Sequence, residues 1–214
     1  MAGIYFNVAG SGCTGLQDFT TWNEVDPNGR MTVTANQVDW ADMRGNDAGD
    51  TFLNKECSFD GDFEHLFEFQ MVDLQANGYN PMFWNLTENG DEDFITMHNR
   101  GDNYIHAYGY SNLSVYSVYL IERYNGSSYS DWVDITGGQY WYIRVERDES
   151  VGNGTLTMTA YGTESNRTNR TGGIWQNSLT LNAKQDFSWI SCPLGSSNGS
   201  AVPHSGTIKN LTLG

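Results

Sequence analysis

The sequence predicts an all-β fold, built as a two-sheet antiparallel jelly-roll sandwich. The composition favours strands and turns, because 24 of the 214 residues are Gly and 12 are Tyr, which are typical of turns and of strands respectively. Short runs of alternating apolar and polar residues also recur along the chain, as they do in half-buried strands. No long stretch shows the spacing of an amphipathic helix.

One domain is expected over residues 18–214, preceded by residues 1–17 as an N-terminal arm or first edge strand. Residues 1–17 are small and Gly-rich, whereas turn clusters and strand-like runs follow from Asp18 onward. The chain has no internal repeat and no Pro-rich linker, and all-β sandwiches of this length commonly form one domain. A domain of this size buries roughly 70% of the surface that its unfolded chain exposes.

Alternating apolar and polar residues locate the strands. In the first of them, Met31, Val33 and Ala35 face one side, and the Thr and Asn residues beside them face the other. The strands predicted in this way span residues 31–36, 63–74, 104–110, 115–124, 140–146, 155–161 and 205–213. Asn-Gly or Asp-Gly pairs, which adopt tight turns readily, occur at residues 28–29, 60–61, 77–78, 89–90, 125–126 and 153–154.

The most specific motif lies in residues 81–98. It reads Pro-Met-Phe-Trp-Asn-Leu-Thr-Glu-Asn-Gly and continues as Asp-Glu-Asp-Phe-Ile-Thr-Met-His. It resembles the Pro-x-Phe-Trp strand, the Glu-Asn-Gly turn and the catalytic strand of family 16 glucanases, which belong to the concanavalin A-like lectin/glucanase superfamily. Residues 205–213 are similar to the Gly-x-Ile-x-x-Leu ending of that superfamily. The resemblance implies a concanavalin A-like jelly roll over residues 18–214.

The same resemblance implies a strand over residues 94–98, preceded by Asp91, Glu92 and Asp93 in a turn. The glucanases carry Glu-x-Asp-x-(x)-Glu on that strand, with the carboxylates on one face, whereas this chain has Phe94, Thr96 and His98 there. Hydrolysis of a glycosidic bond needs two carboxyl groups roughly 5–10 Å apart. We therefore expect a scaffold without the catalytic carboxylates, and a protein that is not an enzyme.

Two predicted strands carry aromatic and polar side chains on one face. The candidate glycan-binding residues are Tyr104, His106, Tyr108, Tyr140, Tyr142 and Arg144. A Tyr ring offers a flat apolar face for the C–H groups of a sugar and a hydroxyl for hydrogen bonding. We expect the two strands to form the floor of one concave groove. The alternative is that these rings pack in the core between the sheets.

Acidic residues near Gly and Asn turns are candidate ligands for Ca²⁺, because hard cations prefer oxygen ligands. The candidate metal ligands are Asp47, Asp50, Asp60 and Asp62. None of these runs matches the twelve-residue EF-hand loop, and solvated turn carboxylates are the alternative. No other cofactor is expected.

The three cysteines, Cys13, Cys57 and Cys192, lack metal-type spacing. Three unpaired thiols are expected, with a Cys57–Cys192 disulfide as the alternative.

The net charge and the hydropathy of the chain indicate which binding partners and which cellular locations are disfavoured. The formal net charge of −15 disfavours nucleic acid and anionic membrane surfaces, which both attract basic proteins. No apolar run is long enough to span a membrane, and the first residues lack the features of a signal peptide. We expect an extracellular or virion-surface location.

These observations favour a non-enzymatic, lectin-like jelly-roll protein. We expect a structural, decoration or adhesion protein of a phage particle, because the N-terminal region is leaderless and small-residue-rich and the domain is acidic and rich in turns. Its expected partners are glycans or polysaccharides, capsid or tail proteins, and further copies of itself. One alternative is a free carbohydrate-binding module. The other is a polysaccharide hydrolase or lyase with relocated catalytic residues, although we expect Glu64 and Glu68 to be outward-facing carboxylates on a strand.

Overall fold

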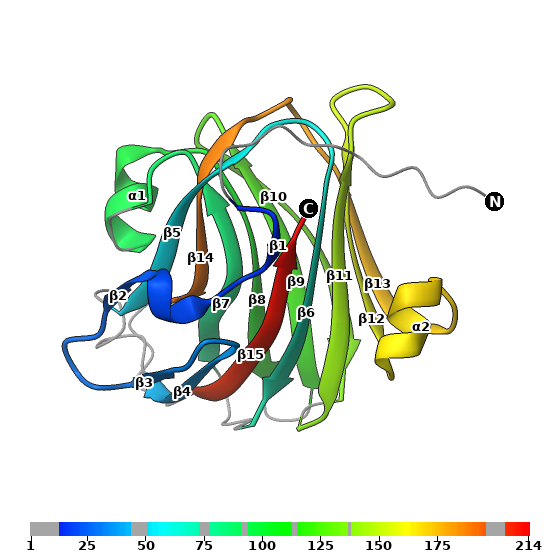
Figure 1. The fold of residues 1–214 in the computed structure, drawn as a ribbon. Coiled ribbons are helices and arrows are strands. Elements are labelled where there is room, and N and C mark those ends of the chain that lie inside the picture. The colour runs from blue at the N-terminus through cyan, green and yellow to red at the C-terminus, as the bar shows by residue number, and fades with distance from the viewer. Residues whose placement is uncertain are drawn as a thin grey trace.

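Two antiparallel β-sheets pack face to face in the computed structural model of the chain (Figure 1). The structure describes residues 13–43, 51–72, 78–90, 94–112, 115–136, 138–195 and 204–214. The neighbouring strands of both sheets run antiparallel. The prediction of an all-β jelly-roll sandwich is therefore confirmed.

Sheet A has the strand order β13-β12-β11-β6-β15-β4-β3, and β1 also pairs with β15. Its strands are β1 (Gly15–Leu16), β3 (Met31–Val33), β4 (Gln37–Met43), β6 (Phe63–Met71), β11 (Tyr140–Asp148), β12 (Thr155–Tyr161), β13 (Gly173–Thr180) and β15 (His204–Leu213). Of the predicted arm over residues 1–17, residues 1–12 lie outside the described residues, and β1 is joined to sheet A.

Sheet B has the strand order β10-β9-β8-β7-β14-β5-β2. Its strands are β2 (Asn23–Val25), β5 (Phe52–Phe59), β7 (Gly78–Thr87), β8 (Tyr104–Asn112), β9 (Val115–Tyr124), β10 (Ser127–Ile135) and β14 (Phe187–Leu194). Three short helices complete the described elements: η1 (Phe19–Thr21), α1 (Phe94–Arg100) and α2 (Glu164–Asn169). None of the helices in the described part of the chain is long and apolar enough to cross a membrane.

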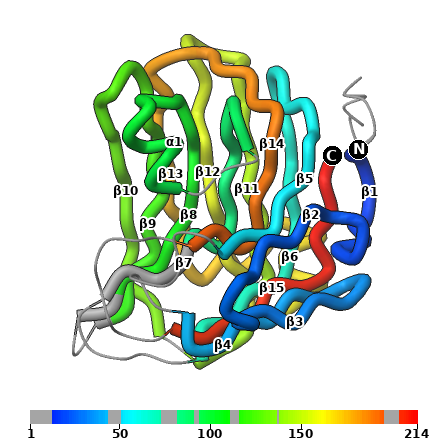
Figure 2. The backbone as a smooth tube through the Cα atoms, turned by 90° about the vertical axis from the view of Figure 1, so that its left-hand side faces the viewer, coloured from blue at the N-terminus to red at the C-terminus, as the bar shows by residue number. Residues whose placement is uncertain are grey.

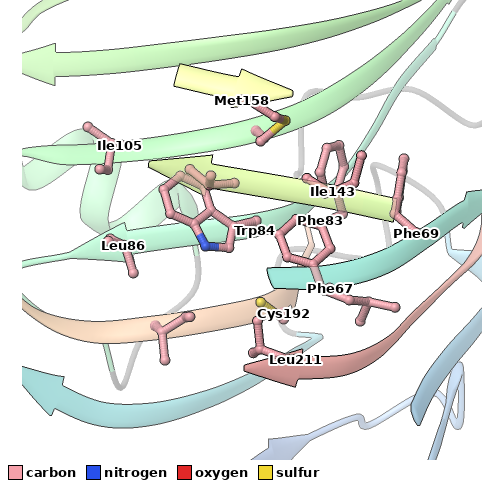
Figure 3. Packing of buried hydrophobic residues seen from close by; sticks show 14 of the residues in the cluster. Phe67, Phe69, Phe83, Trp84, Leu86, Ile105, Ile143, Met158, Cys192 and Leu211 are labelled. Atoms are coloured by element: carbon pink, nitrogen blue, oxygen red, sulfur yellow. The ribbon is translucent and has the colours of Figure 1, made fainter. Parts of the chain in front are cut away.

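The main core fills the space between the two sheets. Phe69 of sheet A stacks on Phe83 of sheet B, with ring centroids 3.9 Å apart, and Figure 3 shows both rings among the buried aliphatic side chains. The Trp84 indole N–H donates a hydrogen bond to His65 Nδ1 at 3.1 Å, which links the sheets through a polar contact. The core fixes which face of each strand points outward, because successive side chains alternate.

Residues 94–100 form helix α1 and not the predicted strand, so Phe94, Thr96 and His98 do not share a strand face. The turn predicted over residues 91–93 lies outside the described residues. Phe94 and Met97 are spaced three apart, which places both on one side of a helix, and Met97 is buried. The helix ends at Gly101, whose φ of +89° lies in the left-handed region that favours Gly. Contact with the sheet has therefore overridden the apparent alternation.

A disulfide joins Cys13 to Cys57, with the Cα atoms 5.6 Å apart, and Cys192 is a buried free thiol. Both expectations for the cysteines, three unpaired thiols or a Cys57–Cys192 pair, were therefore wrong. Cys192 lies in the main core, whereas the segment that precedes β1 brings Cys13 to strand β5. Sequence spacing carries no information on which strands become neighbours, so the pairing was not predictable.

Candidate functional site

The outer face of sheet B carries a group of stacked aromatic side chains and a group of buried polar side chains. On β8, Ile105 and Ala107 point into the main core, so Tyr104, His106 and Tyr108 lie on the opposite, outer face. Figure 2 shows helix α1 in front of the strands of this sheet. The cross-strand register arranges the outward side chains in rows that run across the sheet.

The first row is aromatic. Tyr108 of β8 pairs with Tyr119 of β9, which pairs with Trp132 of β10. Tyr108 and Tyr119 stack with centroids 5.1 Å apart and ring planes 10° apart, and Tyr119 stacks on Trp132 at 6.2 Å and 27°. Trp132 is 53% exposed. We call Tyr108, Tyr119 and Trp132 the aromatic row; it is a continuous stack that ends in an exposed indole.

Sequence reasoning named Tyr108 but neither Tyr119 nor Trp132. Residues 127–135 were not among the predicted strands, so the alternation that places Trp132 opposite the partly buried Val133 was overlooked. Tyr119 was recognised as part of a strand, but its pairing with Tyr108 depends on a register that a single sequence does not reveal.

The second row is polar and lies next to the first. Its members are cross-strand neighbours on β5, β14, β7 and β8, and all are at most 3% exposed: Asn54, Ser191, Asn85 and His106. Within the described residues, neither the amide oxygen nor the amide nitrogen of Asn85 has a hydrogen-bond partner, and Nδ1 of His106 also lacks one. We call these four residues the polar row. Buried groups without partners cost stability, so the row is not explained by packing alone.

Helix α1 packs across these rows through its side chains. The Phe94 ring lies 5.6 Å from the Tyr104 ring and 5.8 Å from the His106 ring, edge to face in both pairs. Met97 belongs to a small apolar cluster with Phe52, Met82 and Leu194 of the sheet, separate from the main core. No backbone hydrogen bond joins α1 to a strand within the described residues. Side-chain packing therefore holds α1 on the sheet.

Arg123 occupies the sheet face beside Tyr104, its cross-strand neighbour. Its guanidinium carbon lies 5.8 Å from the centre of the Tyr104 ring, and Nη1 lies 2.9 Å from His98 Nε2. His98 Nδ1 lies 3.1 Å from the Tyr104 hydroxyl. Burial and then the Arg123 charge lower the pKa of His98, so its imidazole is neutral near pH 7. Burial also raises the pKa of Tyr104, against the effect of Arg123.

The other three candidate residues, Tyr140, Tyr142 and Arg144, lie on β11 in sheet A. The side chains between them, Trp141 and Ile143, point into the main core, so the three face outward on the opposite side of the sandwich. The expectation of one groove formed by both strands was therefore wrong. Alternation identified the outward faces correctly, but it carries no information on which sheet a strand joins.

Ion pairs and cation–π contacts cover this outer face of sheet A. The Arg144 guanidinium is ion-paired with Glu64 and donates to the Arg167 carbonyl of α2 at 2.8 Å. The Lys209 ammonium lies 4.4 Å from the Tyr140 ring centre and 3.1 Å from the Glu68 carboxylate. The two carboxylates of β6 are thus outward-facing and paired. These contacts attach α2 to the sheet and join neighbouring strands.

The candidate calcium ligands do not form a site in the described residues. Asp47 and Asp50 lie outside them. Asp62 accepts a hydrogen bond from the Glu149 backbone N–H at 2.6 Å, and Asp60 is exposed in the same turn. Across the described ranges, no three His, Cys, Asp or Glu side chains gather in a way that could hold a metal ion. Calcium binding stays a prediction.

Comparison with known proteins identifies the fold. No protein-family model matches the chain, and no curated protein matches it. Among solved structures it is similar to a legume lectin-like domain from Entamoeba histolytica, with a TM-score of 0.57, 14% identity, and coverage of 91% of this chain and 90% of that one. The chain has a concanavalin A-like jelly-roll fold.

Two further solved structures, named as a polysaccharide lyase and a GH43 protein, have the same fold. Alginate lyase A1-II′, of polysaccharide lyase family 7, has a TM-score of 0.52 and 9% identity, and 94% of this chain aligns with 92% of that one. The GH43 protein BlXynB from Bacillus licheniformis, solved as a mutant, has a TM-score of 0.62 and 6% identity. In that comparison 100% of this chain aligns with 40% of the GH43 protein. Identities this low establish the fold alone.

Proposed function

We propose that the chain binds carbohydrate on the outer face of sheet B. The observation that carries the proposal is the aromatic row, a stack of three rings in cross-strand register that ends in the exposed indole of Trp132. Aromatic faces of this kind pack against the C–H faces of sugars. Two of the structural neighbours are named as a lectin-like domain and an alginate lyase, which supports carbohydrate as the ligand class.

The polar row supports the same proposal. A sugar presents hydroxyl groups around an apolar ring, so its binding site combines a flat apolar surface with a few placed donors and acceptors. The Asn85 amide offers both a donor and an acceptor, and neither has a hydrogen-bond partner among the described residues. Because α1 lies over part of this row, we assign the first contact with ligand to the exposed end of the aromatic row.

The test is a binding titration with a panel of soluble hexasaccharides, using variants of two exposed aromatic residues. Trp132→Ala is expected to weaken binding at least ten-fold, which corresponds to about 1.4 kcal/mol. The matched control is Tyr140→Ala, because Tyr140 is 42% exposed on the outer face of sheet A; it is expected to leave the affinity unchanged. Loss of binding in Tyr140→Ala with none in Trp132→Ala would contradict the proposal.

We also propose that the protein binds its ligand without cleaving it. The carboxylates of the glucanase motif are missing from residues 94–98 whichever backbone conformation they adopt, and this absence from one segment is the support. Incubation with the same hexasaccharides is expected to release neither new reducing ends nor unsaturated ends. Products that accumulate in proportion to protein concentration, and that Trp132→Ala reduces, would assign a hydrolase or lyase instead.

An extracellular or particle-surface location is part of the proposal. The Cys13–Cys57 disulfide supports it, because disulfides persist in oxidising compartments and are rare in the cytosol. The finer assignment, a structural or adhesion protein of a phage particle with capsid or tail proteins as partners, stays a prediction. Labelling of purified particles with an antibody against this chain tests it, and particles that carry no label would count against it.

A further inference from the structure

Arg123 is a buried arginine that has no carboxylate partner in the part of the chain that the structure describes. Its side chain is 8% exposed, and within the described residues no Asp or Glu oxygen lies within 4 Å of its guanidinium. The other arginines that the structure describes all have ion pairs: Arg30 with Asp42, Arg100 with Asp102, Arg144 with Glu64, Arg147 with Glu149, Arg167 with Glu164, and Arg170 with Glu146. Arg123 therefore departs from the rule that the rest of the chain follows.

The groups around Arg123 do not neutralise it. Its contacts are the His98 imidazole and the Tyr104 ring, and both of these side chains are uncharged near pH 7. Hydrogen bonds from Arg100 lower the pKa of Asp102, and the Arg123 charge adds to that effect, but the Asp102 carboxylate already accepts two hydrogen bonds from Arg100 Nε, at 2.8 and 3.0 Å. Nε of Arg123 has no hydrogen-bond partner among the described residues.

A buried charge without a counter-ion is costly. Natural proteins retain such costs mainly at functional sites. Guanidinium is also the side-chain group best suited to a carboxylate or a sulfate, because its planar N–H groups match two oxygens at once. The missing partner is therefore best supplied by an anionic ligand.

The position of Arg123 connects it with the aromatic row. Tyr119 and Arg123 are four residues apart on β9 and face the same side, so they lie about 13 Å apart at ~3.3 Å per residue. The cross-strand neighbour of Arg123 on β10 is the small, exposed Ser128, so a ligand would approach the guanidinium from that flank. A sugar chain that contacts the exposed Trp132 and the edge of the Tyr119 ring, and that runs along β9, would bring one of its next residues to Arg123.

We propose that Arg123 binds the acidic group, a carboxylate or a sulfate, of an anionic polysaccharide held on the aromatic row. This inference rests on the proposed carbohydrate-binding function and adds the charge class of the ligand. It makes Arg123 a specificity-determining residue: the aromatic row accepts many sugars, and the guanidinium selects those with an oxyanion.

The experiment compares hexasaccharides that differ only in charge. The carboxylate probes are hexagalacturonate and its fully methyl-esterified form, and the sulfate probes are a sulfated galactan hexasaccharide and its desulfated form. Wild-type protein is expected to bind one acidic probe at least ten-fold more tightly than its uncharged counterpart. Arg123→Gln is expected to abolish that preference, and Arg123→Lys to lose most of it, because an ammonium lacks the two-pronged geometry.

Arg170→Gln is the matched control. It removes the same charge from an exposed arginine on the outer face of sheet A, so the preference for the acidic probe should survive. The melting temperature provides a second readout. Arg123→Met is expected to melt at or above the wild-type temperature, because it removes a buried charge that has no carboxylate partner among the described residues. Arg144→Met should melt lower, because it removes one of the two arginines that pair with Glu64 and also the hydrogen bond to the Arg167 carbonyl.

The outcomes separate the inference from the proposed function. Equal affinity of wild-type protein for acidic and uncharged probes, with binding still lost in Trp132→Ala, would overturn the role of Arg123 and leave carbohydrate binding intact. A large fall in the melting temperature of Arg123→Met would also overturn it, because Arg123 would then be structural. Failure of wild-type protein to bind any probe would overturn both.

Discussion

At the scale of single residues, the polar row stands out because three of its members, Asn54, Asn85 and His106, are buried with at least one polar atom that has no hydrogen-bond partner in the described part of the chain. Asn85 is fully buried, and neither polar atom of its side chain has a partner there. A buried polar group left unsatisfied costs roughly 1–3 kcal/mol. Sites that bind ligands commonly carry costs of this kind, because the groups that meet the ligand are unpaired without it. The same residue should therefore oppose stability and favour binding.

Replacing Asn85 by Leu, which has a similar shape, separates these two effects. Asn85→Leu is expected to keep or raise the free energy of unfolding, by up to about 1 kcal/mol, and to weaken binding of the hexasaccharide several-fold. Denaturant unfolding and a binding titration on the same sample measure both. Thr159→Val, on the outer face of sheet A, is the control for a polar-to-apolar change. Wild-type affinity in Asn85→Leu would show that the polar row takes no part in binding.

His65 makes a separate prediction about acid stability. Burial lowers its pKa from 6.5 to about 3, and its contacts are with the Trp84 indole and the Phe59 and Phe63 rings. As pH falls from 6.5 towards 3, the unfolded chain binds a proton on this imidazole and the folded chain does not. The free energy of unfolding should therefore fall over that range, by up to about 1.4 kcal/mol per pH unit.

His65→Phe removes that contribution, so its free energy of unfolding should depend less steeply on pH between 6.5 and 3. His106, whose pKa is also lowered to about 3 by burial, remains in the variant and keeps part of the slope. Urea unfolding at a series of pH values checks this. Parallel pH profiles for the variant and wild-type protein would mean that His65 is accessible to protons in the folded state.

At the scale of elements, the sequence predicted strands well and their partners poorly. Alternation placed Tyr104 and Tyr108 on one face of β8 and Tyr142 on one face of β11, as the structure has them, because side-chain direction is a local property of a strand. The assignment of β8 and β11 to different sheets depends on long-range pairing, which alternation does not encode. Alternation therefore placed Tyr104, His106 and Tyr108 together on one face of β8, whereas Tyr119, Trp132 and Arg123 were not among the predicted site residues. The role of these residues in binding stays a prediction.

Helix α1 also shows that local sequence patterns do not determine how a segment packs. The run from Phe94 to His98 fits a strand by alternation and a helix by the spacing of Phe94 and Met97, and so short a run does not distinguish them. Its packing on the sheet, through Met97 in a cluster separate from the main core, decides for the helix. A short helix attached in this way should be able to move independently of the sandwich.

A matched pair of methionines tests that independence. Met97 is 1% exposed in the small cluster under α1, and Met158 is 0% exposed in the main core. Met158→Ala is expected to cost about 2–5 kcal/mol of global stability. Met97→Ala should instead release α1 locally, with faster amide exchange over residues 94–103 and little change in β9 or β11. A global loss of protection in Met97→Ala would mean that α1 is part of the main cooperative unit.

At the scale of the whole molecule, the two outer faces of the sandwich carry different kinds of side chain. On sheet A, buried arginines are ion-paired and Tyr140 and Tyr142 contact cationic side chains, so the charged groups on that face already have partners. On sheet B, a stacked aromatic row, the polar row, and an arginine without a carboxylate partner among the described residues lie on one face. Ligand binding on sheet B is the simplest account of this asymmetry.

The most direct test of ligand binding on sheet B is an NMR titration. The indole N–H signals of the seven tryptophans are followed while a hexasaccharide that binds the protein is added. Trp132 is exposed on sheet B, whereas Trp141 and Trp175 are buried and pack against each other on the sheet A side. The account predicts that the Trp132 signal shifts in a saturable way and that those of Trp141 and Trp175 do not. Saturable shifts of Trp141 and Trp175 with a stationary Trp132 signal would contradict it.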